Sequence, residues 1–210
     1  MKGMSGAVVH IVDDDEPTRT AMARLIATEG HEVRTYAGAA ELLAALRPGE
    51  PGCIVLDVQM PGLNGLQLQA KIAEREDPLP IIFLTGHGQI PDSVRAIQHG
   101  AIDFLTKPAE GVVLLAAIAR ALAQDAVDRD ARQRLRELRE RYERLTPRER
   151  EVLGHLIAGQ LNKQAAADLN IAERTIKLHR ARIFEKLETD SMAGLTRIAM
   201  ELGITPAESK

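Results

Sequence analysis

Oxygen- and nitrogen-bearing side chains end four apolar, strand-like runs of this sequence, at Asp13-Asp14, Asp57, Thr85 and Lys107. The carboxyl ends of parallel strands lie at one edge of a sheet, where ligands bind. Carboxylate oxygens suit a hard cation such as Mg²⁺, and a hydroxyl and an ammonium suit phosphoryl oxygens. The residue types therefore predict a site for metal-assisted phosphoryl chemistry.

The elements that must position these side chains alternate along the first half of the chain. Short apolar strands are expected at 8–12, 33–36, 53–57, 80–84 and 101–105. Helical patterns lie between and after them, near 17–28, 39–46, 65–76, 91–99 and 110–124. Alternating strands and helices predict an α/β domain with a parallel sheet covered on both faces.

Composition narrows the class of protein. The chain has 210 residues with a net charge of −3, which allows one or two domains. The single Cys53 excludes a disulfide within the chain. No apolar run approaches the roughly 18 residues that span a membrane, and the N-terminus lacks a signal-peptide pattern. We therefore expect a soluble, cytoplasmic protein without a membrane partner.

The segment 125–144 is dense in charge and carries an apolar seam. Its members are spaced like a heptad repeat over two repeats, at Ala131, Leu135, Leu138, Tyr142 and Leu145. Two interpretations stay open. The seam belongs either to a solvated linker helix that rests on a neighbouring domain, or to a short parallel coiled coil in a dimer.

Residues 145–205 show helix signals only. Thr146, Pro147 and Glu149 form a capping-box pattern that begins a helix. Helices are then expected at 162–169 and 172–187, and Ser191 begins a fourth. Two helices joined by so tight a turn are typical of a helix-turn-helix unit.

The first half, over residues 6–124, resembles the receiver domain of two-component response regulators. The matching residues are Asp13-Asp14, Asp57, Thr85 and Lys107-Pro108. The resemblance implies a flavodoxin-like, doubly wound fold with a five-stranded parallel sheet. It also implies that a sensor histidine kinase phosphorylates Asp57, with Mg²⁺ held by Asp13, Asp14, Asp57 and the backbone carbonyl of Gln59.

The same resemblance implies which residues change conformation when Asp57 is phosphorylated. Thr85 and Lys107 would bind the phosphoryl group, and Phe104 would turn inward as Thr85 moves. The Pro91–Phe104 surface would then rearrange and form a homodimer when Asp57 is phosphorylated. Pro108 is expected to follow a cis peptide bond that aims Lys107.

Residues 145–202 resemble the LuxR-type helix-turn-helix domain. The whole chain is thus similar to the FixJ/NarL group of transcriptional regulators, and Gly86-His87-Gly88 and the linker length favour FixJ. The matching segments are Leu145-Thr146-Pro147-Arg148-Glu149, Gly159, Asn162-Lys163, Thr175-Ile176-Lys177-Leu178-His179 and Lys186-Leu187.

Helical geometry sorts the expected recognition helix into faces. Ile176, Ile183 and Leu187 fall on one side, which should be the core face. The opposite side should enter the major groove of DNA, with Lys177 reading base edges beside Arg174, Leu178 and Ala181. Candidate phosphate contacts flank it, at Lys163, Thr175, Arg180 and Arg182.

These features predict a receiver at 6–124, a helical linker at 125–144 and a four-helix DNA-binding domain at 145–205. The expected function is regulated binding to double-stranded promoter DNA, with RNA polymerase as a further candidate partner, and not catalysis. One alternative is a Mg²⁺-dependent phosphohydrolase that uses Asp57 as its nucleophile, although Gln59 stands where such an enzyme needs an acid. Another is a constitutive DNA-binding protein whose receiver serves only for dimerisation.

Overall fold

The computed structural model describes residues 6–86 and 90–207, without the side chains of residues 90–92. His87 and Gly88 of the FixJ-like stretch therefore lie outside the described residues. The chain divides into two compact units, Met1–Arg129 and Asp130–Lys210. Each unit is described by itself below.

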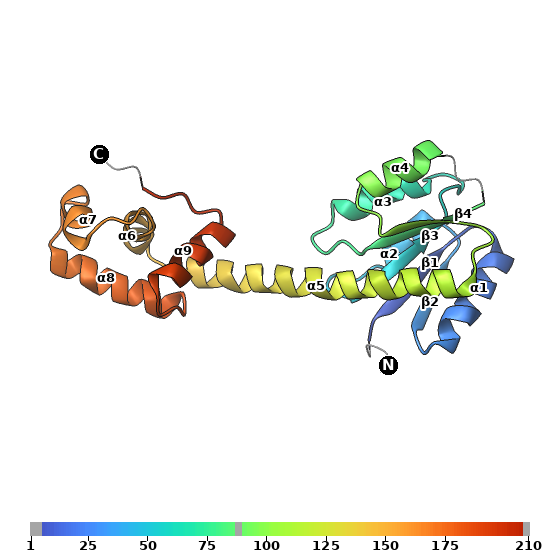
Figure 1. The fold of residues 1–210 in the computed structure, drawn as a ribbon, viewed down its shortest axis with the longest axis horizontal. Coiled ribbons are helices and arrows are strands. Elements are labelled where there is room, and N and C mark those ends of the chain that lie inside the picture. The colour runs from blue at the N-terminus through green and yellow to red at the C-terminus, as the bar shows by residue number, and fades with distance from the viewer. Residues whose placement is uncertain (1–5, 87–89, 208–210) are drawn as a thin grey trace. The chain divides into compact units, whose positions relative to one another are not determined.

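The first unit contains the predicted parallel sheet. Within the described residues its strand order is β2-β1-β3-β4-β5, and each neighbouring pair is parallel (Figure 1). The strands are β1 Val8–Val12, β2 Glu32–Tyr36, β3 Gly52–Leu56, β4 Ile81–Thr85 and β5 Asp103–Thr106. The helices are α1 Glu16–Thr28, α2 Ala39–Ala45, α3 Gly65–Ala73, α4 Ile90–Gln98 and α5 Gly111–Glu143. The α/β fold prediction is thereby confirmed.

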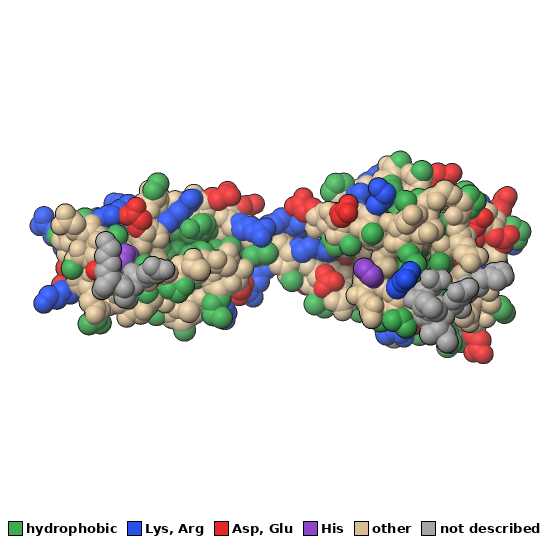
Figure 2. Space-filling view, turned by 90° about the horizontal axis from the view of Figure 1, so that it is seen from above, with side chains coloured by type: hydrophobic (Ala, Val, Ile, Leu, Met, Phe, Trp, Pro, Cys, Tyr) green, Lys and Arg blue, Asp and Glu red, His purple; other side chains and the backbone are tan. Residues whose placement is uncertain are grey.

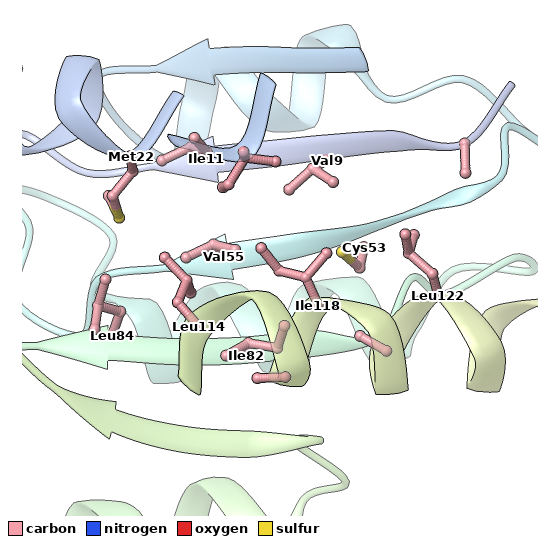
Figure 3. Close-up of a cluster of buried hydrophobic side chains, with 14 residues drawn as sticks. Val9, Ile11, Met22, Cys53, Val55, Ile82, Leu84, Leu114, Ile118 and Leu122 are labelled. Carbon is pink, nitrogen blue, oxygen red and sulfur yellow. The ribbon is translucent and has the colours of Figure 1, made fainter. Parts of the chain in front are cut away.

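The apolar runs form strands because helices cover the sheet on both faces. Every residue of β1, β3 and β4 is buried, as expected for the central strands of a parallel sheet. On one face, side chains from β1, β3 and β4 pack against α1 and α5 (Figure 3). On the other face, Leu42, Leu68 and Ile72 from α2 and α3 pack against the same strands.

A polar pair is buried in the core on the side of the sheet that α2 and α3 cover. His10 is 0% exposed, and its Nδ1 lies 3.0 Å from the Tyr36 hydroxyl. Burial lowers the pKa of His10 to about 4, so the imidazole is neutral at pH 7. The pair thus occupies the core without a buried charge.

The predicted fifth helix and the predicted linker form one continuous helix, α5. No Gly or Pro interrupts the sequence between Gly111 and Pro147, so nothing ends the helix near residue 124. Asp125, the first residue of the predicted linker, is only 2% exposed and its carboxylate accepts a hydrogen bond from the Gly52 N–H at 3.0 Å. Packing of α5 on the sheet therefore extends beyond residue 124.

The apolar seam of α5 is divided in its contacts. Leu138 and Leu145 are buried in the core of the second unit, with Tyr142 packed against it, whereas Ala131 is exposed. Ion pairs flank the buried part, from Arg134 to Glu201 at 3.1 Å and from Arg141 to Glu188 at 3.0 Å. These contacts favour a linker helix that rests on the helical unit, because a coiled coil would need the same side chains for a partner helix.

The second unit consists of helices packed around that core. Their bounds are α6 Pro147–Ile157, α7 Asn162–Asp168, α8 Glu173–Lys186 and α9 Met192–Glu201 (Figure 1). Thr146 begins α6 through the predicted capping box with Glu149, and Ser191 caps α9. Asn170, with a φ of 52°, makes the tight turn between α7 and α8. Among the described residues, no helix is long and apolar enough to cross a membrane.

Candidate functional site

The predicted acidic site assembles at the carboxyl edge of the sheet. Asp13 and Asp57 directly follow β1 and β3, Thr85 ends β4, and Lys107 directly follows β5. The sheet hydrogen bonding continues into these positions, with Asp57 N donating to Val12 O at 2.9 Å and Lys107 N donating to Thr85 O at 2.8 Å. The strands therefore fix the backbone position of each of these residues.

Three carboxylates converge there. Asp13, Asp14 and Asp57 each place an oxygen so that all three atoms lie within 4.8 Å of one another. Asp13 and Asp57 are 1% and 8% exposed, whereas Asp14 is exposed. The arrangement therefore attracts a cation, and it is open to solvent at Asp14.

Lys107 supplies one such charge. Its Nζ lies 2.6 Å from Asp13 Oδ2 and 2.8 Å from Asp57 Oδ2. Burial works to lower the pKa of the ammonium, but the hydrogen bonds to Asp13 and Asp57 outweigh it and raise the pKa above its usual value. Lys107 is therefore charged at neutral pH and joins the ends of β1, β3 and β5.

The donor set fits Mg²⁺. One ammonium does not balance three carboxylates, and two of these are buried, where unbalanced charge is costly. Mg²⁺ prefers oxygen ligands, binds through a few carboxylates and keeps several waters, which the open side beside Asp14 allows. The Gln59 N–H donates to Asp57 Oδ1 at 3.3 Å, which places the Gln59 backbone next to the same carboxylate.

A glycine lets α3 approach the end of β3, where Asp57 lies. A Cβ atom on Gly65 would lie 2.3 Å from the Asp57 carbonyl oxygen, far inside contact distance. Asn64 begins α3 just before it, with a capping box to Gln67. Gly65 is therefore required where the helix meets the end of β3, a constraint that the sequence pattern did not reveal.

The remaining predicted site residues lie on β4 and β5. Thr85 is 1% exposed, and the Lys107–Pro108 bond is cis, as expected. Phe104 is half-buried, with its ring centroid 5.9 Å from that of Phe83. In this structure Phe104 therefore already packs partly against the core.

The helix α8, which is the predicted recognition helix, has the expected division into faces. Ile176, Ile183 and Leu187 are all 0% exposed, which agrees with the predicted core face. The exposed residues of α8 include Arg174, Lys177, Leu178, Ala181 and Arg182. An apolar Leu178 that is 50% exposed among charged neighbours suits contact with a base rather than with water.

Neighbouring groups restrain some of the predicted DNA contacts. Lys177 Nζ lies 3.4 Å from a Glu173 carboxylate oxygen, an exposed pair that costs little to break. Arg180 stacks over the Phe184 ring at 5.5 Å, and Thr175 is half-buried. Lys163 is exposed on α7, and Figure 2 shows Lys and Arg side chains on the surface of this unit.

Two polar contacts with structural importance are not predicted by the sequence patterns. Lys186 Nζ lies 2.7 Å from the buried Glu149 carboxylate and donates to the Arg144 carbonyl at 3.0 Å. Arg19 donates from a terminal nitrogen to the Asp13 carbonyl at 2.5 Å. A signal for Arg19 exists, because a cation in the first turn of a helix opposes the helix dipole and requires another partner.

Comparisons with known protein families divide the chain in the same way. Residues 9–119 match the response regulator receiver domain, and residues 143–199 match the bacterial regulatory proteins of the luxR family. Nodulation protein W of Bradyrhizobium diazoefficiens is 40% identical over 199 residues, which cover 95% of this chain and 88% of that protein. Transcriptional regulatory protein FixJ of Rhizobium meliloti is 36% identical over 208 residues, 97% of this chain and 100% of that protein.

Solved structures show the same likeness. Response regulator StyR is 42% identical with a TM-score of 0.81, over 94% of this chain and all of that one. Full-length FixJ from B. japonicum is 36% identical with a TM-score of 0.57, over 95% of this chain and 98% of that one. With both domain matches in order along one chain, the protein belongs to the response-regulator family, in the group that joins a receiver domain to a LuxR-type DNA-binding domain.

Proposed function

We propose that the protein is a transcriptional regulator activated by phosphorylation of Asp57 by a partner sensor histidine kinase. The observation that carries this proposal is the position of the Asp57 carboxylate at the end of β3, within 2.8 Å of Lys107 Nζ and beside two further carboxylates. Such a carboxylate can act as a nucleophile, and the Lys107 ammonium offsets part of the negative charge that an anionic donor would meet. The family membership supports the same role.

The chemistry follows from the residues. A carboxylate oxygen of Asp57 attacks phosphorus, the new O–P bond replaces the bond to the donor nitrogen of the kinase, and that nitrogen leaves with the electron pair. Asp13, Asp14, Asp57 and the Gln59 carbonyl would hold Mg²⁺, which supplies charge neutralisation when bound. The Lys107 ammonium and the Thr85 hydroxyl offer donors to the phosphoryl oxygens.

The output proposed is dimerisation followed by DNA binding. Thr85 and Phe104 lie on the adjacent strands β4 and β5, so a movement of Thr85 toward a phosphoryl oxygen leaves room for Phe104 to turn inward. The Pro91–Phe104 surface then pairs with a second copy. Two paired helix-turn-helix units bind a two-part operator with a high effective concentration, and RNA polymerase is the further partner through which transcription changes.

Replacing Lys177 by Ala should weaken specific DNA binding by about 1–3 kcal/mol, because base-edge contacts carry discrimination of that size. The measurement is a gel-shift titration of phosphorylated protein against an operator obtained by selection from random duplexes. The Arg182→Ala variant is the matched comparison, since loss of a phosphate contact weakens binding to all duplexes alike. Wild-type operator affinity in the Lys177→Ala variant would contradict the proposed groove face.

A further inference from the structure

Arg19 makes a side-chain contact from α1 to the acidic site. It is the fourth residue of that helix and is half-buried. A guanidinium nitrogen donates a hydrogen bond to the Asp13 backbone carbonyl oxygen at 2.5 Å. The contact joins the first turn of α1 to the end of β1, where the carboxylates converge.

The Arg19 bond completes the restraint of Asp13. Asp13 N donates to the Tyr36 carbonyl at 3.2 Å, Oδ1 accepts from the Asp15 N–H at 2.9 Å, and Oδ2 accepts from Lys107 at 2.6 Å. The carbonyl oxygen, which accepts from Arg19, is the fourth polar atom. All four polar atoms of this nearly fully buried residue are therefore held.

The restraint passes to Asp14 through the backbone. The carbonyl of Asp13 belongs to the planar peptide group that also contains the N and Cα atoms of Asp14. A hydrogen bond that fixes this oxygen therefore also fixes the orientation of the Asp14 N–Cα bond. Asp14 is exposed, so packing does little to aim its carboxylate. The orientation of the Asp13–Asp14 peptide matters for placing an Asp14 oxygen within 4.8 Å of the other two carboxylates.

We propose that Arg19 is a positioning residue for the divalent cation: it holds the Asp13–Asp14 peptide so that both carboxylates face the metal. The inference rests on the proposed function, since it presumes that the carboxylates bind Mg²⁺. Partners that orient metal ligands in this way change metal affinity by about 10- to 100-fold when they are removed.

The charge of Arg19 has the opposite effect on a cation. A guanidinium near the carboxylates repels Mg²⁺, so charge alone predicts that its removal strengthens metal binding. Positioning predicts that its removal weakens metal binding. The sign of the change therefore separates the two roles.

The test is the Mg²⁺ concentration that raises the unfolding temperature of the full chain by a fixed amount, measured by calorimetry without any phosphodonor. The Arg19→Met variant should need about 10- to 100-fold more Mg²⁺ than the wild type. The Arg19→Lys variant keeps the charge and a donor and should fall between them. Arg24→Met, at an exposed position of the same helix, should behave as the wild type.

Unfolding in the presence of a chelator gives the metal-free stability of each variant, so a folding defect is seen separately from a change in metal binding. Equal or tighter Mg²⁺ binding by Arg19→Met than by the wild type would overturn the positioning role. A wild type that Mg²⁺ does not stabilise would instead overturn the metal site of the proposed function, and the role of Arg19 with it.

Discussion

The Asp57→Asn variant is expected to take up no label from a radioactive small-molecule phosphodonor, whereas the wild type becomes labelled in the presence of Mg²⁺. The amide lacks the charge and the lone-pair reactivity of the carboxylate, so no O–P bond forms at residue 57. The amide oxygen is also a weaker ligand than a carboxylate for a hard cation. Both effects act in the same direction, and the signal should fall to the background of the assay.

A control separates the loss of the Asp57 carboxylate from the loss of a negative charge elsewhere in the same region. Glu16, the first residue of α1, is exposed and follows Asp14 by two positions in the sequence. The Glu16→Gln variant removes one negative charge without removing a carboxylate of the converging cluster, and it should label like the wild type. Retention of label by Asp57→Asn would show that another residue accepts the phosphoryl group.

The Lys186→Met variant is expected to destabilise the DNA-binding unit by roughly 3 kcal/mol. Glu149 is 1% exposed, and Lys186 is a cation 2.7 Å from its carboxylate. Removing one partner of such a pair leaves a buried charge uncompensated, which costs about 3–5 kcal/mol, and partial exposure of Lys186 places the effect at the lower end. Hydrogen exchange of peptides from α6 and α8 should accelerate on the order of 100-fold.

The same pair gives a dependence on pH. Burial works to raise the pKa of Glu149, but hydrogen bonds to Lys186 and Thr146 outweigh it and lower the pKa below its usual value. A carboxyl with a lowered folded-state pKa adds stability above its unfolded pKa of about 4.3, and this stability is lost as the pH falls through the folded-state pKa.

The difference between the wild type and Lys186→Met should therefore shrink below about pH 4, where Glu149 takes up a proton. Lys163→Met, an exposed lysine of α7, is the control and should exchange like the wild type at each pH. A Lys186→Met variant with wild-type exchange rates at pH 7 would show that the pair contributes nothing to the fold.

The receiver site was predictable because its residues stand at the ends of strands. In a parallel sheet the strand ends share one edge, so Asp13, Asp57 and Lys107 meet whenever the runs before them form strands. Their apolar composition and length predict those strands to within two residues at every end. The structure places the Lys107 ammonium between Asp13 and Asp57, at hydrogen-bond distance from both.

Contacts that depend on a helix axis or on a backbone carbonyl were not predictable. The sequence between Gly111 and Pro147 contains no residue that ends a helix, yet a strongly charged composition after residue 124 suggested a separate linker. The bond from Asp125 to the Gly52 N–H depends on how α5 crosses the sheet, which no local pattern encodes. Arg19 binds a carbonyl, an acceptor that every residue carries, so its partner could not be identified from residue type.

The helical unit shows the same division between local and tertiary information. Helical periodicity assigned Ile176, Ile183 and Leu187 to the core because a 100° rotation per residue is the same in any α-helix. The heptad seam was ambiguous, since Leu138 and Leu145 could pack on a partner helix or on their own chain. The structure buries both in the core of the second unit, which periodicity alone could not decide.

The role of Asp57 in dimerisation can be measured by sedimentation equilibrium of the wild type and Asp57→Asn, each with Mg²⁺ and with or without beryllofluoride, a mimic of an aspartyl phosphate. We expect a shift from monomer to dimer in the wild type only, and only when beryllofluoride is present. A wild type whose mass does not respond to beryllofluoride, or an Asp57→Asn variant that responds equally, would contradict the assignment of Asp57 as the switch that controls dimerisation.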